Sequence, residues 1–345
     1  MKLCLVTNYL NKGYINEILI FNQLKTTLNL SPEDVISFYD ENKVYNINKQ
    51  YTHALILLDY NITSYKFILN FLKELDIPKI FIVDSIPEVH KHLNQEFVTS
   101  YSNIKDFVFS TLKTSEWLEI YNLADGLVFY NSIDYHEFFK IHNLEKIPSS
   151  IIPPSLGKKE DIVFNSNNVI KNKNIGFNGD PSYPNGMFNY GFLYDKLPDY
   201  NFSIYGTHGK NHQKSEAILN HVVDNCDNVR FYGKLKDTKS FYLRNFLYYD
   251  FVIYNSFSFS MYKSLINGVI PIIGRNTSSH LYLKNYPFTA EHMNTDSLHN
   301  QIQQIQNTSV SELISIMSNT VNNIKHLNDK NLKGLYYELA QSISI

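Results

Sequence analysis

Five segments in the second half of the chain decide the fold: NIGFNG (174–179), NFSIYG (201–206), NVRFYG (228–233), DFVIYNS (250–256) and MYKSLINGVIPIIG (261–274). The first four are short runs rich in β-branched and aromatic residues, which is typical of buried strands. The fifth begins with helical spacing over residues 262–267 and ends in a strand pattern, VIPIIG (269–274). Strands that alternate with helices predict a parallel sheet covered by helices on both faces.

The first half of the chain shows the same alternation. We expect strands at residues 2–7, 35–39, 54–60, 79–83 and 126–132, and helices at 15–28, 64–75, 115–125 and 133–143. In the second half, helices are expected at 188–197 and 240–249, and the tail, 310–342, has a helical pattern. Pro153, Pro154 and the polar run that follows predict a linker at residues 157–173.

Composition sets limits on the function. A chain of 345 residues is long enough for two hydrophobic cores. With 43% hydrophobic and 19% charged residues, it has a globular composition. The net charge is −2, and the only arginines are Arg230, Arg244 and Arg275. Because proteins that bind duplex nucleic acid rely on a basic excess, nucleic acid is the weaker alternative for a partner.

The cysteines and the N-terminus indicate the compartment. Cys4 and Cys226 lie far apart within apolar, strand-like runs, so we expect buried thiols and a reducing environment. The N-terminal residues lack the apolar region and cleavage site of a signal peptide. No run approaches the ~20 apolar residues of a membrane span. We therefore expect a soluble, cytoplasmic protein with peripheral membrane contact at most.

In order and spacing, residues 174–275 resemble the donor domain of GT-B glycosyltransferases, and the retaining group in particular. The segments LADGLVFYNSIDYHEFF (123–139) and IIPPSLG (151–157) resemble the end of the acceptor domain and the interdomain linker of that fold. The resemblance implies an α/β GT-B fold, with two facing Rossmann-like domains, a cleft between them and a C-terminal helix that crosses back. It assigns residues 1–156 to the acceptor domain, 157–173 to the linker, 174–310 to the donor domain and 311–345 to the returning helices.

The same resemblance implies transfer of a sugar from a nucleotide diphosphate-sugar, with UDP-sugar the expected donor, to a glycan, lipid-linked or other hydroxyl acceptor. It implies no metal and no cofactor beyond that co-substrate. The donor-binding candidates are Gly179, Asp180, Gly206, Gly233, Lys234, Asn255, Ser256, Lys263 and Ser264. The acceptor-side candidates are Asn11, Gly13, His90 and His92.

Glycines at strand ends give part of this site a physical basis. Open α/β sheets bind ligands at the carboxyl ends of their strands, where glycines let backbone amides approach phosphates. Gly179, Gly206, Gly233 and Gly268 are expected at or near such ends. The alternative is that each is simply a turn glycine.

The chain departs from the retaining group at its charged donor contacts. An arginine and a lysine that follow the first glycine in that group correspond to Asp180 and Asn185 here. Two glutamates of that group correspond to Asn255 and Lys263. A carboxylate accepts hydrogen bonds from ribose hydroxyls, whereas lysine only donates. Lys263 is therefore a candidate for the diphosphate, as are Lys234 and, more weakly, Arg275, and the alternative for each is a solvated surface side chain.

One segment of the first half suggests an inverting reaction. IFIVD (80–84) followed by SIPEVHKH (85–92) resembles the stretch of the phage DNA β-glucosyltransferases that carries their catalytic aspartate. The match implies that Asp84 is the general base that deprotonates the acceptor hydroxyl. The alternative is an aspartate that caps the following turn. His90 and His92, two residues apart, do not share a helix face, which disfavours a zinc site.

Three rival functions stay open. The missing arginine, lysine and glutamates favour a non-catalytic GT-B relative that binds a protein or a glycan. The IFIVD segment alone favours a DNA base glucosyltransferase. Two Rossmann-like halves also fit a nucleotide-sugar epimerase. An NAD enzyme is disfavoured, because only Gly13 of a G-x-G-x-x-G fingerprint follows the first strand.

Overall fold

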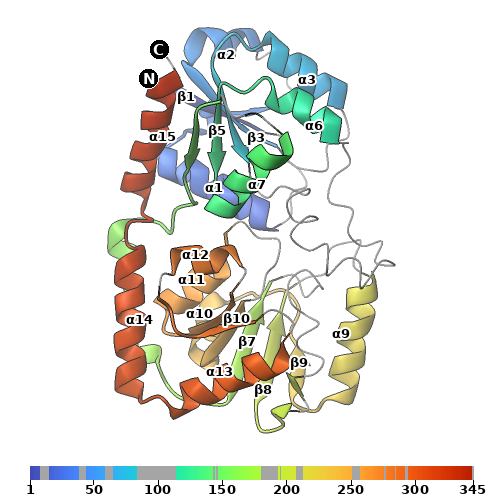
Figure 1. Cartoon of the computed structure of the whole chain (residues 1–345), viewed down its shortest axis with the longest axis vertical. Helices are drawn as coiled ribbons and strands as arrows, with labels where there is room; N and C mark the ends of the chain where they lie inside the picture. The colour runs from blue at the N-terminus through green and yellow to red at the C-terminus, as the bar shows by residue number, and fades with distance from the viewer. Residues whose placement is uncertain are drawn as a thin grey trace. The chain divides into compact units, whose positions relative to one another are not determined.

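The computed structural model consists of two compact α/β units (Figure 1). It describes residues 1–7, 15–38, 44–58, 65–83, 114–142, 144, 147–179, 193–194, 196–206, 213–250, 257–275, 277–283, 285–291 and 294–343. Unit 1 comprises Met1–Lys159 together with Leu327–Ile345, and unit 2 comprises Glu160–His326. Each unit is built around one six-stranded sheet, and the paired strands are parallel.

The sheet of unit 1 has the strand order β2-β1-β3-β4-β5-β6. Its strands are β1 (Leu3–Thr7), β2 (Val35–Ser37), β3 (His53–Leu57), β4 (Lys79–Val83), β5 (Gly126–Phe129) and β6 (Ser149–Ile151). Its helices are α1 (Ile15–Leu28), α2 (Val44–Gln50), α3 (Tyr65–Glu74), α6 (Thr114–Tyr121), α7 (Ser132–His142) and α15 (Asp329–Ile343). Every residue of β1 and of β3 is buried, as expected for strands covered by helices on both faces.

The sheet of unit 2 has the order β12-β11-β10-β7-β8-β9. Its strands are β7 (Asn174–Asn178), β8 (Asn201–Tyr205), β9 (Val229–Phe231), β10 (Leu247–Asp250), β11 (Ile270–Gly274) and β12 (Thr289–Ala290). Its helices are α9 (Gln213–Asn225), α10 (Thr238–Arg244), α11 (Phe259–Ile266), α12 (Ser278–Tyr282), α13 (Thr295–Asn307) and α14 (Val310–Ile324). The chain adds β8 and β9 on one side of β7 and then places β10 on the other side, so the strand order reverses between β7 and β10. Ligands of open α/β sheets bind at such a reversal.

The C-terminal helices belong to both units. Helices α13 and α14 lie in unit 2, and α15 returns to unit 1. There α15 packs beside α1 and β5. The Thr27 hydroxyl of α1 donates to Asp329 Oδ1 at the start of α15 over 2.9 Å.

The predicted boundary between helix 240–249 and strand 250–256 is wrong. Helix α10 ends at Arg244 with Asn245 as its C-cap, and β10 already begins at Leu247. Residues 246–249 are all buried, because β10 is an inner strand of the sheet. A continuous apolar run fits a buried helix or a buried strand equally well, which explains the error. Residues 251–256 lie outside the described residues.

Two further expectations concern the thiols and the membrane. Cys4 is buried, and burial raises the pKa of its thiol to about 12, so the thiol stays protonated. Cys226 is only half-buried, which differs from the expectation, because it follows the end of α9 and does not lie within a strand. Among the residues described, no helix has the length and apolar character that a membrane crossing requires.

Candidate functional site

Three predicted donor-site glycines lie side by side in unit 2. Gly179 directly follows β7 and Gly206 directly follows β8, whereas Gly233 lies two residues beyond the end of β9. These three strands are neighbours in the sheet. The Gly179 amide donates to the Tyr205 carbonyl over 3.0 Å, and the Gly206 amide donates to the Gly233 carbonyl over 2.8 Å. Gly233 has φ +67°, which other residues rarely adopt. The structure thus brings three predicted residues together at the carboxyl edge, beside the reversal of strand order.

An aromatic pair and a lysine lie next to this row of turns in the chain. The rings of Tyr205 and Tyr232 stack with centroids 4.8 Å apart, and Tyr232 is 45% exposed. Burial raises the pKa of the Tyr205 hydroxyl, and a hydrogen bond from Arg244 opposes that rise. Lys234 follows Gly233 and is exposed. The end of β9 therefore offers an exposed ring and a cation next to a glycine turn.

Several predicted site residues lie outside the described residues. On the donor side these are Asp180, which follows Gly179 in the chain, and Asn255 and Ser256, which come after β10. In the first half they are Asn11, Gly13, Asp84, His90 and His92. Their roles stay predictions.

Gly268 is not at the carboxyl edge, which corrects the expectation for this glycine. It precedes β11 and ends α11, with φ +85°. Its amide donates to the Leu265 carbonyl over 3.2 Å, and the Val269 amide donates to the Ser264 carbonyl over 2.9 Å. These two bonds form a Schellman motif, which closes a helix with a glycine in the left-handed conformation.

Arg275 does lie at the carboxyl edge, directly after β11. Its amide donates to the Ala290 carbonyl over 3.1 Å, and its guanidinium lies 3.7 Å from the Glu291 carboxylate. Both side chains are more than half exposed, so this ion pair is weak.

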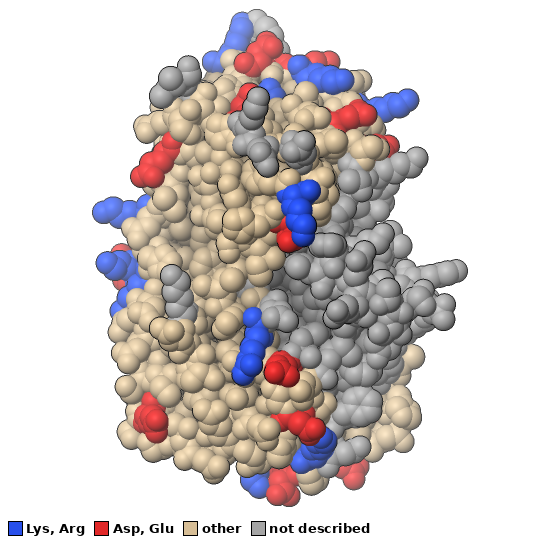
Figure 2. All heavy atoms as spheres, in the orientation of Figure 1, with Lys and Arg blue, Asp and Glu red and all other residues tan. Residues whose placement is uncertain are grey.

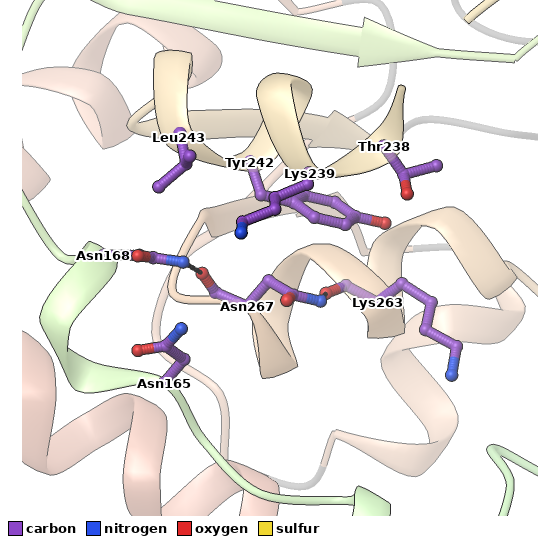
Figure 3. Close-up of a pocket in the computed structure, with 8 residues that line it drawn as sticks. All are labelled: Asn165, Asn168, Thr238, Lys239, Tyr242, Leu243, Lys263 and Asn267. Carbon is purple, nitrogen blue, oxygen red and sulfur yellow. Dashed lines mark hydrogen bonds between the residues drawn. The ribbon is translucent and has the colours of Figure 1, made fainter. Parts of the chain in front are cut away.

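A pocket of about 500 Å³ lies in unit 2 between α10 and α11 (Figure 3). The 3₁₀ turn η4 (Ser166–Asn168), with the residue before it, closes one side. The lining residues are Asn165, Asn168, Thr238, Lys239, Tyr242, Leu243, Lys263 and Asn267. The pocket therefore lies within the helical layer that covers one face of the sheet.

One wall of this pocket is formed by the linker residues Asn165 and Asn168, and hydrogen bonds attach this wall to the end of α11. Asn168 Nδ2 donates to the Asn267 carbonyl over 2.9 Å, and Asn267 Nδ2 donates to the Lys263 carbonyl over 2.7 Å (Figure 3). The Asn165 amide donates to the Ile266 carbonyl over 2.9 Å. The last carbonyls of α11 thus receive partners, and the wall is held in place.

Two neighbouring predicted residues on α11 have different surroundings. Lys263 lines the pocket. Ser264 is completely buried, and its hydroxyl has no hydrogen-bond partner among the described residues. Successive residues of a helix point about 100° apart, so one faces the pocket while the next faces the interior.

The sequence interpretation missed most of the pocket. The missed residues are Asn165, Asn168, Thr238, Lys239, Tyr242, Leu243 and Asn267. A signal was present on α10, since residues 238 and 242, and 239 and 243, are four apart and share a helix face. The two linker asparagines carried no such signal, because their place depends on the packing of α11. Within the described parts of the chain, no group of three or more His, Cys, Asp or Glu side chains could hold a metal ion.

Comparison with known proteins shows similarity in structure only. The chain matches no family model and, by sequence, no curated protein. It superposes on the sucrose-phosphate synthase of Thermosynechococcus elongatus with a TM-score of 0.74, at 10% identity, over 100% of this chain and 99% of that one. HepE of Anabaena, solved with UDP and glucose, gives a TM-score of 0.71 at 12% identity, over 99% and 100% of the two chains.

A UDP-forming α,α-trehalose-phosphate synthase of Burkholderia xenovorans, solved with glucose-6-phosphate, gives a TM-score of 0.69 at 8% identity, over 99% of this chain and 100% of that one. These similarities extend over nearly the whole length of both chains in each pair, and identities of this size establish the fold alone. The chain therefore has the two-domain α/β fold of the GT-B glycosyltransferases.

Proposed function

We propose that this chain transfers a sugar from a UDP-sugar to a hydroxyl acceptor, with the donor bound in unit 2. The observation that carries the proposal is the row of glycine turns after β7, β8 and β9, beside the reversal of strand order. Support also comes from similar structures solved with UDP and glucose or with glucose-6-phosphate. A phosphorylated sugar is thus a reasonable first acceptor to test.

In this proposal the turns bind the diphosphate of the donor. Because these glycines carry no side chain, a diphosphate can approach the backbone of the turns closely. Lys234 and Arg275, exposed at the same edge, add positive charge for the leaving UDP. Asp84 takes the proton of the acceptor hydroxyl, whose oxygen attacks the anomeric carbon as the bond to the diphosphate breaks.

Release of UDP from UDP-glucose, with glucose and glucose-6-phosphate as acceptors, tests the reaction. We expect Asp84→Asn to lower kcat about 100-fold or more, since general-base catalysis contributes about that much. Asp76→Asn is the matched control, because Asp76 is an exposed aspartate elsewhere in the same half of the chain, and it should turn over like the wild type. Turnover of Asp84→Asn near the wild-type rate would remove Asp84 as the base.

A second candidate function is binding without catalysis. It is favoured by Lys263, a lysine where the resembling retaining enzymes carry a glutamate, in the wall of the α10–α11 pocket. A thermal-shift panel of UDP, GDP, ADP and CMP with their sugar conjugates separates the two. A ligand at ~100 times its Kd should stabilise the protein by about 2.7 kcal/mol. Stabilisation without any turnover supports the binding function.

A further inference from the structure

We propose that the pocket between α10 and α11 binds a phosphorylated ligand of the size of a sugar phosphate or a mononucleotide. The proposal goes beyond the donor edge, and it holds even if the chain transfers no sugar. The ligand is either a nucleotide or a sugar phosphate without a base, and both carry a phosphate ester on a sugar ring. The experiment below distinguishes them.

The charge of the lining favours an anion. Of the eight lining residues two are lysines, Lys239 and Lys263, and none is an aspartate or a glutamate. The nearest acidic residue in the chain, Asp237, is occupied as the N-cap of α10: Oδ1 accepts from the Lys239 amide over 3.0 Å, and Oδ2 accepts from the Ser240 hydroxyl. Lys239 extends its ammonium toward Asn168 and Asn267, whereas the Lys263 ammonium points away from them (Figure 3). The lining thus presents the positive charge of Lys239 to a ligand, and it includes no carboxylate.

The remaining polar groups of the lining include donors that phosphate and sugar oxygens accept. The Tyr242 ring lies between the two helices, with its hydroxyl toward Thr238 (Figure 3). Burial raises the pKa of that hydroxyl to about 12, so it stays protonated and able to donate. The side-chain amide of Asn165 also borders the pocket.

Size and shape favour more than a bare phosphate ion. A volume of about 500 Å³ lies in the range of pockets that hold small organic ligands. Leu243, 57% exposed, and the face of Tyr242 add apolar surface that a phosphate alone does not need. A ribose or hexose ring carries both apolar C–H groups and hydroxyls, and therefore fits this mixed lining.

The walls are held in place before any ligand arrives. The linker bonds to α11 through Asn165 and Asn168, and α11 closes in the Schellman motif at Gly268. On the other side, a methyl group on Gly176 of β7 would lie 2.7 Å from Phe241 of α10, so α10 packs directly on the sheet. A preformed site loses less free energy to ordering when it binds.

The test is calorimetric titration of the full chain with UMP, ribose 5-phosphate and uridine. We expect UMP or ribose 5-phosphate to bind, and uridine, which lacks the phosphate, to bind at least tenfold more weakly than UMP. Because UMP also fits the donor edge, only the binding that Leu243→Trp removes is compared between the two probes. Stronger binding of UMP than of ribose 5-phosphate by tenfold or more then identifies a nucleotide as the ligand class of the pocket. Binding within tenfold of each other identifies a sugar phosphate.

Variants place the binding in the pocket. Lys239→Ala should raise the Kd of the phosphorylated probe about tenfold or more, because a hydrogen bond to the charged phosphate is lost. Lys236→Ala is the matched control, an exposed lysine of the same segment outside the lining, and should bind like the wild type. Leu243→Trp, at an exposed position, should fill the pocket and abolish binding while the melting temperature without ligand stays near wild type.

The proposal is overturned if neither phosphorylated probe binds, or if Lys239→Ala and Leu243→Trp both bind like the wild type. Equal losses in Lys239→Ala and Lys236→Ala would also overturn it, because they would indicate unspecific attraction to surface charge. These outcomes leave the transfer reaction untouched, since UDP release and Asp84→Asn test it separately.

Discussion

Each unit has a strand glycine against which a helix packs, Gly176 in β7 of unit 2 and Gly126 in β5 of unit 1, and the two glycines have different neighbours. In unit 2, a Cβ at Gly176 would lie 2.7 Å from Phe241 Cζ and from Asn245 Cγ, a ring and a branched amide held at the sheet. In unit 1, a Cβ at Gly126 would meet Cδ1 of Ile343, the flexible tip of a side chain at the end of α15. The comparison indicates that α10 packs on its sheet through a contact that leaves no space for a methyl group. At the end of α15, by contrast, the contact involves a side-chain tip that can change its rotamer.

The largest loss of stability is expected for a substitution at Gly268, in the turn after α11 that contacts the linker residue Asn165. A Cβ at Gly268 would lie 2.6 Å from the Asn165 carbonyl oxygen, a backbone atom, at φ +85°. Gly268→Ala should lower the free energy of unfolding by about 3 kcal/mol, because left-handed strain adds to the overlap. Urea denaturation measures it, and a loss below about 1 kcal/mol would show that the linker is not fixed to α11.

Gly176→Ala should lower the free energy of unfolding by about 1–3 kcal/mol, because the added methyl group overpacks the contact with α10. The melting temperature should fall by about 2–4 °C for each kcal/mol in a chain of this size. Differential scanning calorimetry measures the change. No change would mean that α10 moves freely on the sheet, and the contrast between the units would be lost.

Gly126→Ala should cost less than about 1 kcal/mol, because Ile343 Cδ1 can rotate away. Gly334→Ala is the matched control in α15: nothing lies within 4 Å of its Cβ, so alanine should stabilise the helix by about 0.5–1 kcal/mol. Urea denaturation of both variants shows the sign. A loss at Gly126 as large as that at Gly176 would contradict the flexible contact.

The smallest effect concerns pH and the docking of α15. Burial lowers the pKa of His53, which is 3% exposed, although its bond to the Ala340 backbone acts in the opposite direction. A lowered pKa means that the unfolded chain binds the proton more readily, so stability is complete above the unfolded value of about 6.5 and falls as pH drops through the lowered folded value. His53→Gln should flatten this dependence below pH 6.5 in thermal melts, and an unchanged slope would exclude His53 as its source.

Much of the fold was predictable because its strands are unambiguous. β1, β3 and β4 are apolar runs bounded by polar residues, and three glycines end strands of unit 2. The start of β10 was not predictable from pattern alone. Leu247, Tyr248 and Tyr249 are buried in an inner strand, and such a run has no alternation to distinguish it from a helix.

The donor edge was partly predictable and the pocket was not. Gly206 and Gly233 were identified because each ends a strand-like segment, and they are hydrogen-bonded to each other. Gly268 resembled them in sequence but closes a helix, a difference that only the φ angle and the Schellman bonds reveal. The pocket depends on how α10, α11 and the linker pack together, which the spacing of the residues does not encode.

Charge on the surface bears on the nucleic-acid alternative. Figure 2 shows lysines and arginines interspersed with aspartates and glutamates over the face in view. This agrees with the net charge of −2. Duplex binding draws on clustered cations, and the described residues on the face in view show no such cluster.

The central claim is that the turns after β7, β8 and β9 hold the diphosphate of a nucleotide-sugar. Hydrogen exchange of backbone amides with and without saturating UDP tests it most directly. The account predicts slower exchange in peptides that contain Gly179, Gly206 or Gly233, with β1 of unit 1 unchanged as the internal reference. Exchange at these three turns that stays the same when UDP is saturating, or a failure of UDP to bind at all, would contradict it.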